Sequence, residues 1–349
     1  MPVLERAKKK GRKFQNPVET KQAMFGLLFK ILKLYKTNKE ERIPRHTLGP
    51  FHTDASIYDH PPASGLRITW MGHSSMLIEI DGLRVLLDPV WDKRASPVSW
   101  AGPKRFFGAP LPLNELPALD VILNSHDHYD HLGAQTIREL SHLPAARNAQ
   151  WVTSLGVGKR LRCFGVNPEK IAELDWTESL TVAAQKPSSE SPTAAELKIT
   201  ALPARHFSGR GMFDRFDTLW SSFVLQGSRH KIYFGADSGL WDGFAEIGRQ
   251  YGPFDLTMLE VGAFNPLWKS IHMGPDGAAE AFTMMGASGL LMPIHWGLFS
   301  LALHAWRQPI ERIIELADQS GFKLWSPAPG VPTEVIPGEP HRSPWWRSP

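Results

Sequence analysis

The sequence has little cysteine, little excess charge and no long apolar run near its start. Its 349 residues include one cysteine, Cys163, which excludes a disulfide within the chain and any cysteine-rich zinc module. The apolar stretch 23–29 ends at Lys30 and no small-residue cleavage site follows it. This stretch is too short to span a bilayer, and the pattern argues against a cleaved signal peptide. With 42% apolar and 21% charged residues, we expect a globular, cytoplasmic protein rather than a disordered one.

The small net charge of +4 is unevenly distributed. Residues 1–45 contain 13 Lys and Arg against 4 Asp and Glu, whereas the rest of the chain is mildly acidic. Between Met24 and Tyr35, apolar residues recur at helical spacing with lysines between them. A basic amphipathic helix can bind an anionic phospholipid surface. We therefore predict an N-terminal arm over residues 1–45 that brings the protein to the inner membrane; packing of this helix on the protein itself remains an equal alternative.

The middle of the chain alternates between two kinds of pattern. Short apolar segments, typical of strands, lie at 67–70, 76–80, 83–88, 118–125, 150–153, 198–202, 222–225, 231–234, 256–261 and 290–295. Helical patterns lie at 133–142, 241–250, 276–285 and 310–317. This alternation predicts an α/β layered domain, which we place at residues 46–335. A tail, 336–349, follows, and its Trp345-Trp346 pair is expected to dock on the body.

The densest chemical signal follows the predicted strand 118–125. Three histidines and two aspartates occupy six consecutive positions, in the order His126, Asp127, His128, Tyr129, Asp130, His131. Neutral imidazole and carboxylate are the usual ligands of zinc and similar divalent ions. One loop cannot complete the shells of two ions, so other strand ends must contribute. Three side chains that follow predicted strands are candidates: His206, Asp237 and His295.

This order of motifs resembles the metallo-β-lactamase superfamily: His-x-His-x-Asp-His, then a histidine, then Gly-Ala-Asp-Ser-Gly at 235–239, then a late histidine. Within it, further segments are similar to the branch of N-acylphosphatidylethanolamine-hydrolysing phospholipase D. They are Trp-Met-Gly-His-Ser-Ser (70–75), Leu-Asp-Pro (87–89), Arg-Ala-Ser-Pro (94–97), Gly-Pro-Lys-Arg-Phe (102–106), Glu-Leu-Asp-Trp (173–176), Pro-Ala-Arg-His (203–206), Ile-His-Trp-Gly (294–297) and Phe-Gln-Asn-Pro (14–17).

The resemblance implies a four-layer αβ/βα sandwich with two divalent metal ions in a cleft at the sheet edges. On matching positions, the first ion is held by His126, His128 and His206, and the second by Asp130, His131 and His295, with Asp237 bridging both. Zinc is the expected metal, although iron or manganese also suits such ligands. Two ions that share a water lower its pKa to about 7, which makes a hydroxide nucleophile available between them.

Several other residues are candidates for supporting roles. Asp127 lies inside the motif without being a ligand, and we expect it to orient a ligand or pass a proton, so that it joins Asp130 and Asp237 as a catalytic carboxylate. Asp88, at a strand end, is expected to orient a metal-bound histidine. His73 and His272 are expected to support the site or to contact substrate.

The combined signals favour a phosphodiesterase of phospholipase D type that acts on N-acylphosphatidylethanolamine-like phospholipids. A soluble sugar-phosphate lactonase, or another phosphoester or carboxyl-ester hydrolase of the superfamily, is the alternative. A nucleic-acid hydrolase is disfavoured because the body is acidic and the arm lacks a stacking aromatic pattern. The complete set of seven ligands argues against a non-catalytic scaffold. The sequence leaves a homodimer open.

Overall fold

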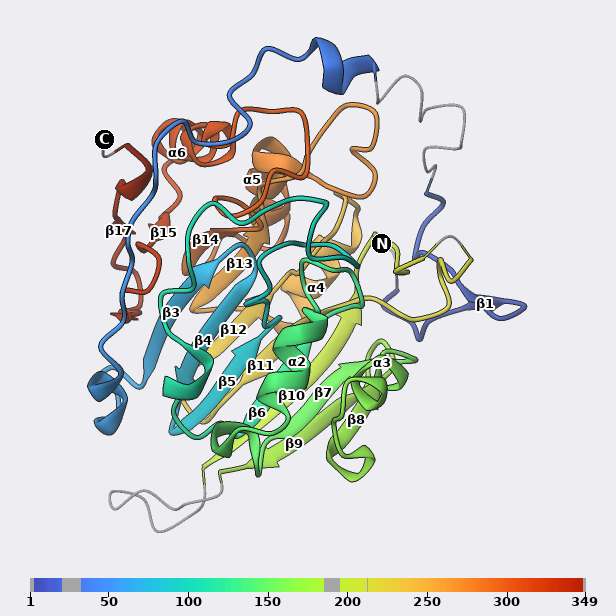
Figure 1. Ribbon diagram of the computed structural model, residues 1–349, viewed down its shortest axis with the longest axis vertical. Coiled ribbons are helices and arrows are strands. Elements are labelled where there is room, and N and C mark those ends of the chain that lie inside the picture. Colours follow the sequence, from blue (N-terminus) through green and yellow to red (C-terminus); the bar gives the residue numbers. More distant parts are fainter. Residues whose placement is uncertain (1–2, 21–32, 185–194, 212, 348–349) are drawn as a thin grey trace.

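Two β-sheets pack face to face in the computed structural model, which describes residues 3–20, 33–184, 195–211 and 213–347 (Figure 1). The first sheet has the strand order β16-β3-β4-β5-β6-β7-β8. Its strands are β3 (Leu66–Gly72), β4 (Ser75–Ile80), β5 (Leu83–Leu87), β6 (Val121–Asn124), β7 (Gln150–Ser154), β8 (Ile171–Leu174) and β16 (Thr333–Glu334). The strands β3, β4 and β5 are antiparallel, whereas β5, β6, β7 and β8 run parallel.

The second sheet has the order β14-β13-β12-β11-β10-β9. Its strands are β9 (Ser179–Ala183), β10 (Glu196–Pro203), β11 (Ser221–Gln226), β12 (Lys231–Phe234), β13 (Leu256–Glu260) and β14 (Leu290–Ile294). From β9 to β12 the strands are antiparallel, and from β12 to β14 they are parallel. Two short pairs lie outside these sheets: β1 (Lys9–Lys10) with β2 (Lys13–Phe14), and β15 (Trp325–Ser326) with β17 (His341–Arg342).

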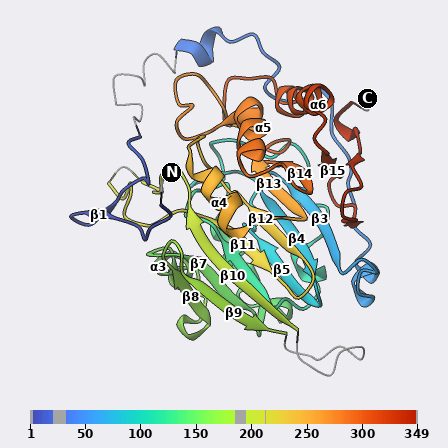
Figure 2. The ribbon, with the colours of Figure 1, turned by 180° about the vertical axis from the view of Figure 1, so that it is seen from behind.

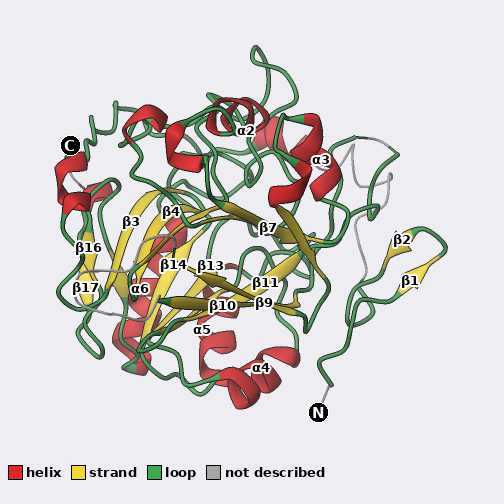
Figure 3. Cartoon of the chain, turned by 90° about the horizontal axis from the view of Figure 1, so that it is seen from below, coloured by secondary structure: helices red, strands yellow, loops and turns green. Residues whose placement is uncertain are grey.

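Helices cover the outer face of each sheet, which gives four layers (Figure 3). On the first sheet lie α2 (Ala134–Leu140) and α3 (Gly158–Cys163). On the second sheet lie α4 (Gly243–Tyr251), α5 (Gly274–Met284) and α6 (Gln308–Ser320). Short 3₁₀ turns are η1 (Ala55–Asp59), η2 (Leu113–Glu115), η3 (Pro144–Ala146), η4 (Pro168–Lys170) and η5 (Trp345–Arg347). None of the helices in these described ranges has the length and hydropathy that a bilayer crossing needs.

The alternation of side chains along the first sheet explains the layers. Leu77, Leu86 and Ile122 pack with Ile137 of α2, whereas their chain neighbours belong to the core that the two sheets share. Successive residues of a strand point to opposite faces, so a strand that is apolar at consecutive positions must be covered on both sides. The continuous apolar runs therefore fit the buried centre of a sandwich.

The two ends of the chain pack on the outside of this sandwich. The β1–β2 hairpin lies beside the loops that follow β10, and residues 33–48 run along the molecule toward the C-terminal segment (Figures 1 and 2). The predicted amphipathic helix falls mostly outside the described residues, although residues 33–37 are helical. At the other end, Trp345 and Trp346 are buried, and Trp345 stacks on Trp296.

Candidate dinuclear metal centre

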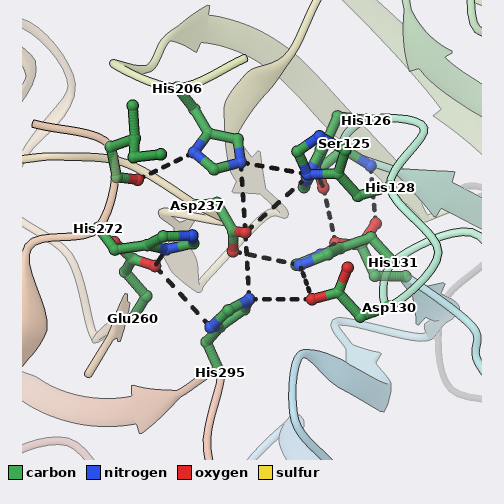
Figure 4. A network of polar contacts seen from close by, with 12 residues as sticks. Ser125, His126, His128, Asp130, His131, His206, Asp237, Glu260, His272 and His295 are labelled. Atoms are coloured by element: carbon green, nitrogen blue, oxygen red, sulfur yellow. Dashed lines mark hydrogen bonds and ion pairs between the residues drawn. The ribbon is translucent and has the colours of Figure 1, made fainter. Parts of the chain in front are cut away.

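The candidate metal ligands come from loops at one edge of the two sheets. Strands β5, β6, β12, β13 and β14 run parallel within their sheets, and β10 has the direction of β12 because both are antiparallel to β11. Polar residues that follow these strands therefore meet at the same edge. The loop 126–131 follows β6, His206 follows β10, Asp237 follows β12 and His295 follows β14. The fold thus brings all seven predicted ligands together (Figure 4).

One group of ligand atoms consists of His126, His128, His206 and Asp237, whose candidate ligand atoms lie within 4.8 Å of one another. His126 Nε2 is 2.9 Å from His128 Nδ1, and His206 Nε2 is 3.3 Å from the same atom. Asp237 Oδ2 lies 3.5 Å from His206 Nε2. These three imidazoles thus direct a ring nitrogen toward one point beside a carboxylate.

A second group consists of His73, Asp130, His131 and His295. Asp130 Oδ2 lies 3.3 Å from His295 Nε2 and 3.6 Å from His131 Nε2. Asp237 reaches this group as well, because its Oδ1 is 3.2 Å from His131 Nε2 and its Oδ2 is 3.1 Å from His295 Nε2. Asp237 therefore lies between the two groups, as its predicted bridging position requires.

Several buried atoms of this cluster lack a hydrogen-bond partner, and their chemistry fits divalent cations. His131 Nε2, His295 Nε2 and Asp237 Oδ1 are buried and make no hydrogen bond to the described part of the protein. Buried polar atoms normally have a partner, and leaving them without one is costly. The other ligand atoms around them are imidazole nitrogens or carboxylate oxygens, the donor types that zinc, iron and manganese share. The residues present thus suit two such ions without distinguishing between the metals.

Partners outside the cluster fix the orientation of the ligands. Asp88 Oδ2 is 2.7 Å from His131 Nδ1, and Asp88 also accepts hydrogen bonds from the amide and hydroxyl of Ser125. The carbonyl of Ile271 is 2.9 Å from His206 Nδ1. When Nδ1 carries the proton, Nε2 is the nitrogen available for a metal. Asp88 is therefore placed to orient His131, one of the candidate ligands.

Glu260, at the end of β13, is a site residue that the sequence analysis missed. Its side chain is fully buried, and its Oε2 is 2.6 Å from His272 Nδ1. Together with Asp237 and His295, these two residues form a third cluster of ligand-type atoms. An acidic residue that ends a wholly buried strand was the available signal, since such a charge needs a partner. The predicted His272 thus lies at the site, held by a residue that was not predicted.

The carboxylate of Asp127 is turned toward the neighbouring loop rather than the ligand cluster. Its Oδ1 accepts a hydrogen bond of 2.7 Å from the amide of Gly209, and its Oδ2 is 3.4 Å from Arg160 Nε. Asp127 therefore joins the loop that carries His128 to the loop that carries His206. His73, which was also predicted to support the site, contacts the cluster directly: its Nε2 lies 2.9 Å from Asp130 Oδ2.

Electrostatics in the cluster favour positive charge beside the carboxylates. Burial alone would raise the pKa of Asp237, but the charges of His131 and His295 hold it well below its usual range. Burial alone would lower the pKa of His295, but Asp237 and Asp130 raise it to about 10. For His126 and His206, burial dominates and lowers the pKa well below 6.5. The latter two imidazoles therefore stay neutral, which is the form that binds a metal.

Several residues at the candidate metal centre have a strained backbone conformation. His73, Asp88 and His295 have positive φ angles of 57°, 38° and 63°, and so does Ala236 beside Asp237, with 48°. Residues with a Cβ rarely adopt this conformation, which costs about 1–3 kcal/mol each. The surrounding structure holds it in place: the amide of His295 donates to the carbonyl of His73, and the amide of His73 to that of Trp296.

Comparison with known proteins agrees with the family resemblance of the sequence motifs. The family described as "Beta-lactamase superfamily domain" matches residues 83–296. An uncharacterized protein of Mycobacterium tuberculosis is 44% identical over 288 residues, which cover 82% of this chain and 73% of that protein. N-acyl-phosphatidylethanolamine-hydrolyzing phospholipase D 1 of Caenorhabditis elegans is 34% identical over 288 residues, which cover 80% of this chain and 75% of that enzyme.

Solved structures share the fold at low sequence identity. An isothiocyanate hydrolase from Delia radicum gut bacteria has a TM-score of 0.58 and 17% identity, and the match covers 78% of this chain and 100% of that one. The diiron β-hydroxylase CmlA from Streptomyces venezuelae has a TM-score of 0.53 and 15% identity, with 79% and 55% covered. These matches confirm the predicted four-layer fold. The chain belongs to the beta-lactamase superfamily and is a metal-dependent hydrolase, as its motifs predicted.

Proposed function

We propose that the protein is a phosphodiesterase of phospholipase D type that hydrolyses N-acylphosphatidylethanolamine-like phospholipids at a two-metal centre. The observation that carries this substrate class is the 34% identity to the C. elegans phospholipase along 80% of the chain. An enzyme of the same name from Saccharomyces cerevisiae is 32% identical over 73% of the chain. The convergence of seven ligand-type side chains supports the chemistry that such a reaction needs.

The proposed ligand assignment follows the two groups described above. His126, His128 and His206 hold one ion, Asp130, His131 and His295 hold the other, and Asp237 belongs to both. Zinc is the proposed metal. When bound, a pair of divalent ions supplies Lewis-acid chemistry and a water of lowered pKa for attack on phosphorus.

The chain's own residues orient ligands and substrate. Asp88 keeps the proton of His131 on Nδ1, so that Nε2 faces the centre. Glu260 accepts the Nδ1 proton of His272, and in the doubly protonated ring the Nε2–H is then free to donate to an oxygen of the substrate phosphate. We assign His272 to this substrate contact, because its ring lies 5.0 Å from that of His206 and 5.2 Å from that of His295.

The proposal includes contact with an anionic membrane surface. Lys9, Lys10 and Arg12 are exposed on the β1–β2 hairpin. Each cation near an anionic membrane contributes about 1 kcal/mol to binding. These side chains provide the cationic face, whereas the predicted amphipathic helix of the arm lies mostly outside the described residues.

The direct test is hydrolysis of N-acylphosphatidylethanolamine in mixed micelles, with release of the N-acylethanolamine measured for metal-loaded wild type and Asp237→Ala. We expect turnover by the wild type and a loss of at least 100-fold in Asp237→Ala, because removal of the shared carboxylate weakens both ion sites. Asp276→Ala, at an exposed position on α5, is the matched control and should retain full activity.

A soluble phosphodiester and a sugar-phosphate lactone complete the experiment. A folded, metal-loaded wild type that cleaves either of these but not the phospholipid would overturn the substrate assignment and favour a soluble hydrolase. Unchanged phospholipid hydrolysis in Asp237→Ala would overturn the two-metal assignment instead.

A further inference from the structure

The first part of the N-terminal arm is docked on the protein rather than free. Phe14 is 4% exposed and packs with Trp176, Ala204, Leu219 and Trp220 in a small apolar cluster of its own. Its amide donates a hydrogen bond of 2.9 Å to the carbonyl of Phe216. Burial of a phenylalanine side chain removes a large apolar surface from water, so this contact stabilises the docked position of the arm. This anchor places the hairpin on the loops that follow β10 and precede β11.

Charge pairs connect the basic arm to the mildly acidic body. Arg6 lies 2.7 Å from Glu178, and Lys13 lies 2.8 Å from Asp217. Lys13 also donates to the carbonyl of Phe213. Exposed pairs such as these contribute little stability one by one. Their positions agree with the place where Phe14 anchors the hairpin, and they give part of the arm's charge a partner within the chain.

Beyond the hairpin, the arm reaches the backbone of a candidate metal ligand. Asn16 Nδ2 donates a hydrogen bond of 2.8 Å to the carbonyl oxygen of His206. The residue before that ligand, Arg205, is held as well, since its Nε donates to Thr20 Oγ1 and its Nη2 to the carbonyl of Glu19. Residues 14–20 therefore contact the segment 204–206 through the side chains of Phe14, Asn16 and Thr20.

His206 lies apart from its two histidine partners in the sequence. His126 and His128 share one short loop directly after β6, whereas His206 stands apart in an irregular segment after β10. Its ring is oriented by the carbonyl of Ile271. The preceding residue, Arg205, is also held by the body of the protein, through Ser238 Oγ and the amide of Gly239, and the arm adds the contact to the His206 carbonyl itself. Residues that orient metal ligands change metal affinity about 10- to 100-fold when they are mutated.

The second described part of the arm contacts the loop after another ligand, His295. Tyr35 donates to the carbonyl of Leu301 at 3.3 Å, and Asn38 donates to that of Leu303. The amide of Trp306 in turn donates to the carbonyl of Glu41 at 2.9 Å. The arm therefore contacts the backbone of one proposed ligand, His206, and the segment 301–306 that follows another, His295.

From these contacts we propose that the N-terminal arm is a clasp on the metal centre, in which Asn16 is a positioning residue for His206. The clasp rests on the proposed role of His206 as a ligand, and it is independent of the lipid substrate. Residues 14–20 then support the metal centre, whereas the exposed hairpin before them remains available for contact with lipid.

The test compares metal retention in wild type, Asn16→Ala and Asn16→Asp, with Gln15→Ala as the matched control, because Gln15 carries an exposed amide side chain directly beside Asn16. Each protein is loaded with Zn²⁺ and the release of metal to a chromophoric chelator is followed. We expect release about tenfold faster in Asn16→Ala, and at least as fast in Asn16→Asp, whose carboxylate cannot donate to the His206 carbonyl. Gln15→Ala should match the wild type.

Cobalt-loaded proteins add a readout that a general loss of stability would not move. The visible absorption of Co²⁺ should change in Asn16→Ala while the thermal unfolding midpoint of the metal-free protein stays at the wild-type value. Wild-type release and spectrum in both Asn16 variants would overturn the clasp. His206→Ala separates the two proposals: if this variant retains both metals, the ligand assignment itself fails; if it loses one metal while the Asn16 variants retain both, only the clasp fails.

Discussion

At the scale of single residues, the proposed metal ligands make hydrogen bonds to partners that fix the positions of their protons. Asp88 is fully buried, accepts from His131 Nδ1 at 2.7 Å and accepts twice from Ser125. In Asp88→Asn, an amide nitrogen replaces one carboxylate oxygen, so one of these donors loses its acceptor. We expect metal affinity to fall about 10- to 100-fold with the fold retained.

Chelator competition measures this affinity, and activity at saturating metal shows whether the chemistry survives. Asp276→Asn is the control, because that carboxylate pairs with Arg312 at the surface of α5. Equal metal affinity in Asp88→Asn and wild type would mean that Asp88 does not orient His131.

The sequence analysis identified the residues that carry chemistry better than those that support it. The motif 126–131 and the strand-end residues His206, Asp237 and His295 were predicted, because so many imidazoles and carboxylates at the end of a buried strand are costly unless they bind a cation. Their roles as ligands remain predictions. Glu260 was missed because it closes an apolar strand with no other polar residue of the site beside it in sequence. The direction of the Asp127 side chain depends on Gly209, which is 82 positions away.

At the scale of elements, Asp81 joins the two sheets at the edge opposite the metal centre. It lies in the turn between β4 and β5 and accepts hydrogen bonds from the amides of Arg229 and His230, in the turn between β11 and β12. Its other oxygen is 2.7 Å from His230 Nδ1. Burial alone would raise the pKa of Asp81, but these hydrogen bonds outweigh burial and lower it below 3.8.

A carboxyl group with a lowered folded-state pKa stabilises the fold above its unfolded pKa, and this contribution is lost as the pH falls through the folded value. We therefore expect Asp81→Asn to lower the free energy of unfolding by about 1–3 kcal/mol at pH 7. The difference from wild type should shrink as the pH falls below 3.8. Urea unfolding of metal-free proteins across this range measures it, and a difference independent of pH would contradict this account.

Short and one-sided elements were the ones that the sequence did not reveal. The analysis predicted strands β3 to β7 and β10 to β14, whose apolar runs are buried, with ends that differ by a few residues. It missed β8 and β9, two partly exposed strands that lie at an edge of the first and of the second sheet, and β16, which has two residues. Such strands form because a neighbouring strand offers hydrogen bonds, and the local sequence does not show which strand that neighbour is. The same holds for the arm, since Asn16 meets its partner 190 positions away.

At the scale of the whole molecule, the proposed ions connect loops from both sheets. A ligand that binds only the folded protein stabilises it by about 4 kcal/mol when present at 1,000 times its dissociation constant. Removal of the ions with a chelator should therefore lower the thermal unfolding midpoint by about 5–15 °C. Scanning calorimetry with and without chelator measures the shift.

Asp237→Ala provides the internal comparison for this experiment. Because Asp237 contacts both groups of ligands, the chelator should shift the midpoint of this variant much less than that of the wild type. An identical midpoint for wild type with and without chelator would show that the ions do not connect the two sheets.

The spread of the ligands along the chain also sets the order of events during synthesis. Loop 126–131 emerges early, but its partners His206, Asp237 and His295 follow over the next 170 or so positions, and both sheets must close before these loops meet. A half-made chain on the ribosome thus displays the histidines of one loop without the proposed ligands from the other strands. We therefore expect metal loading to be a late step in the maturation of this protein, in which the ions reach the finished fold rather than the growing polypeptide.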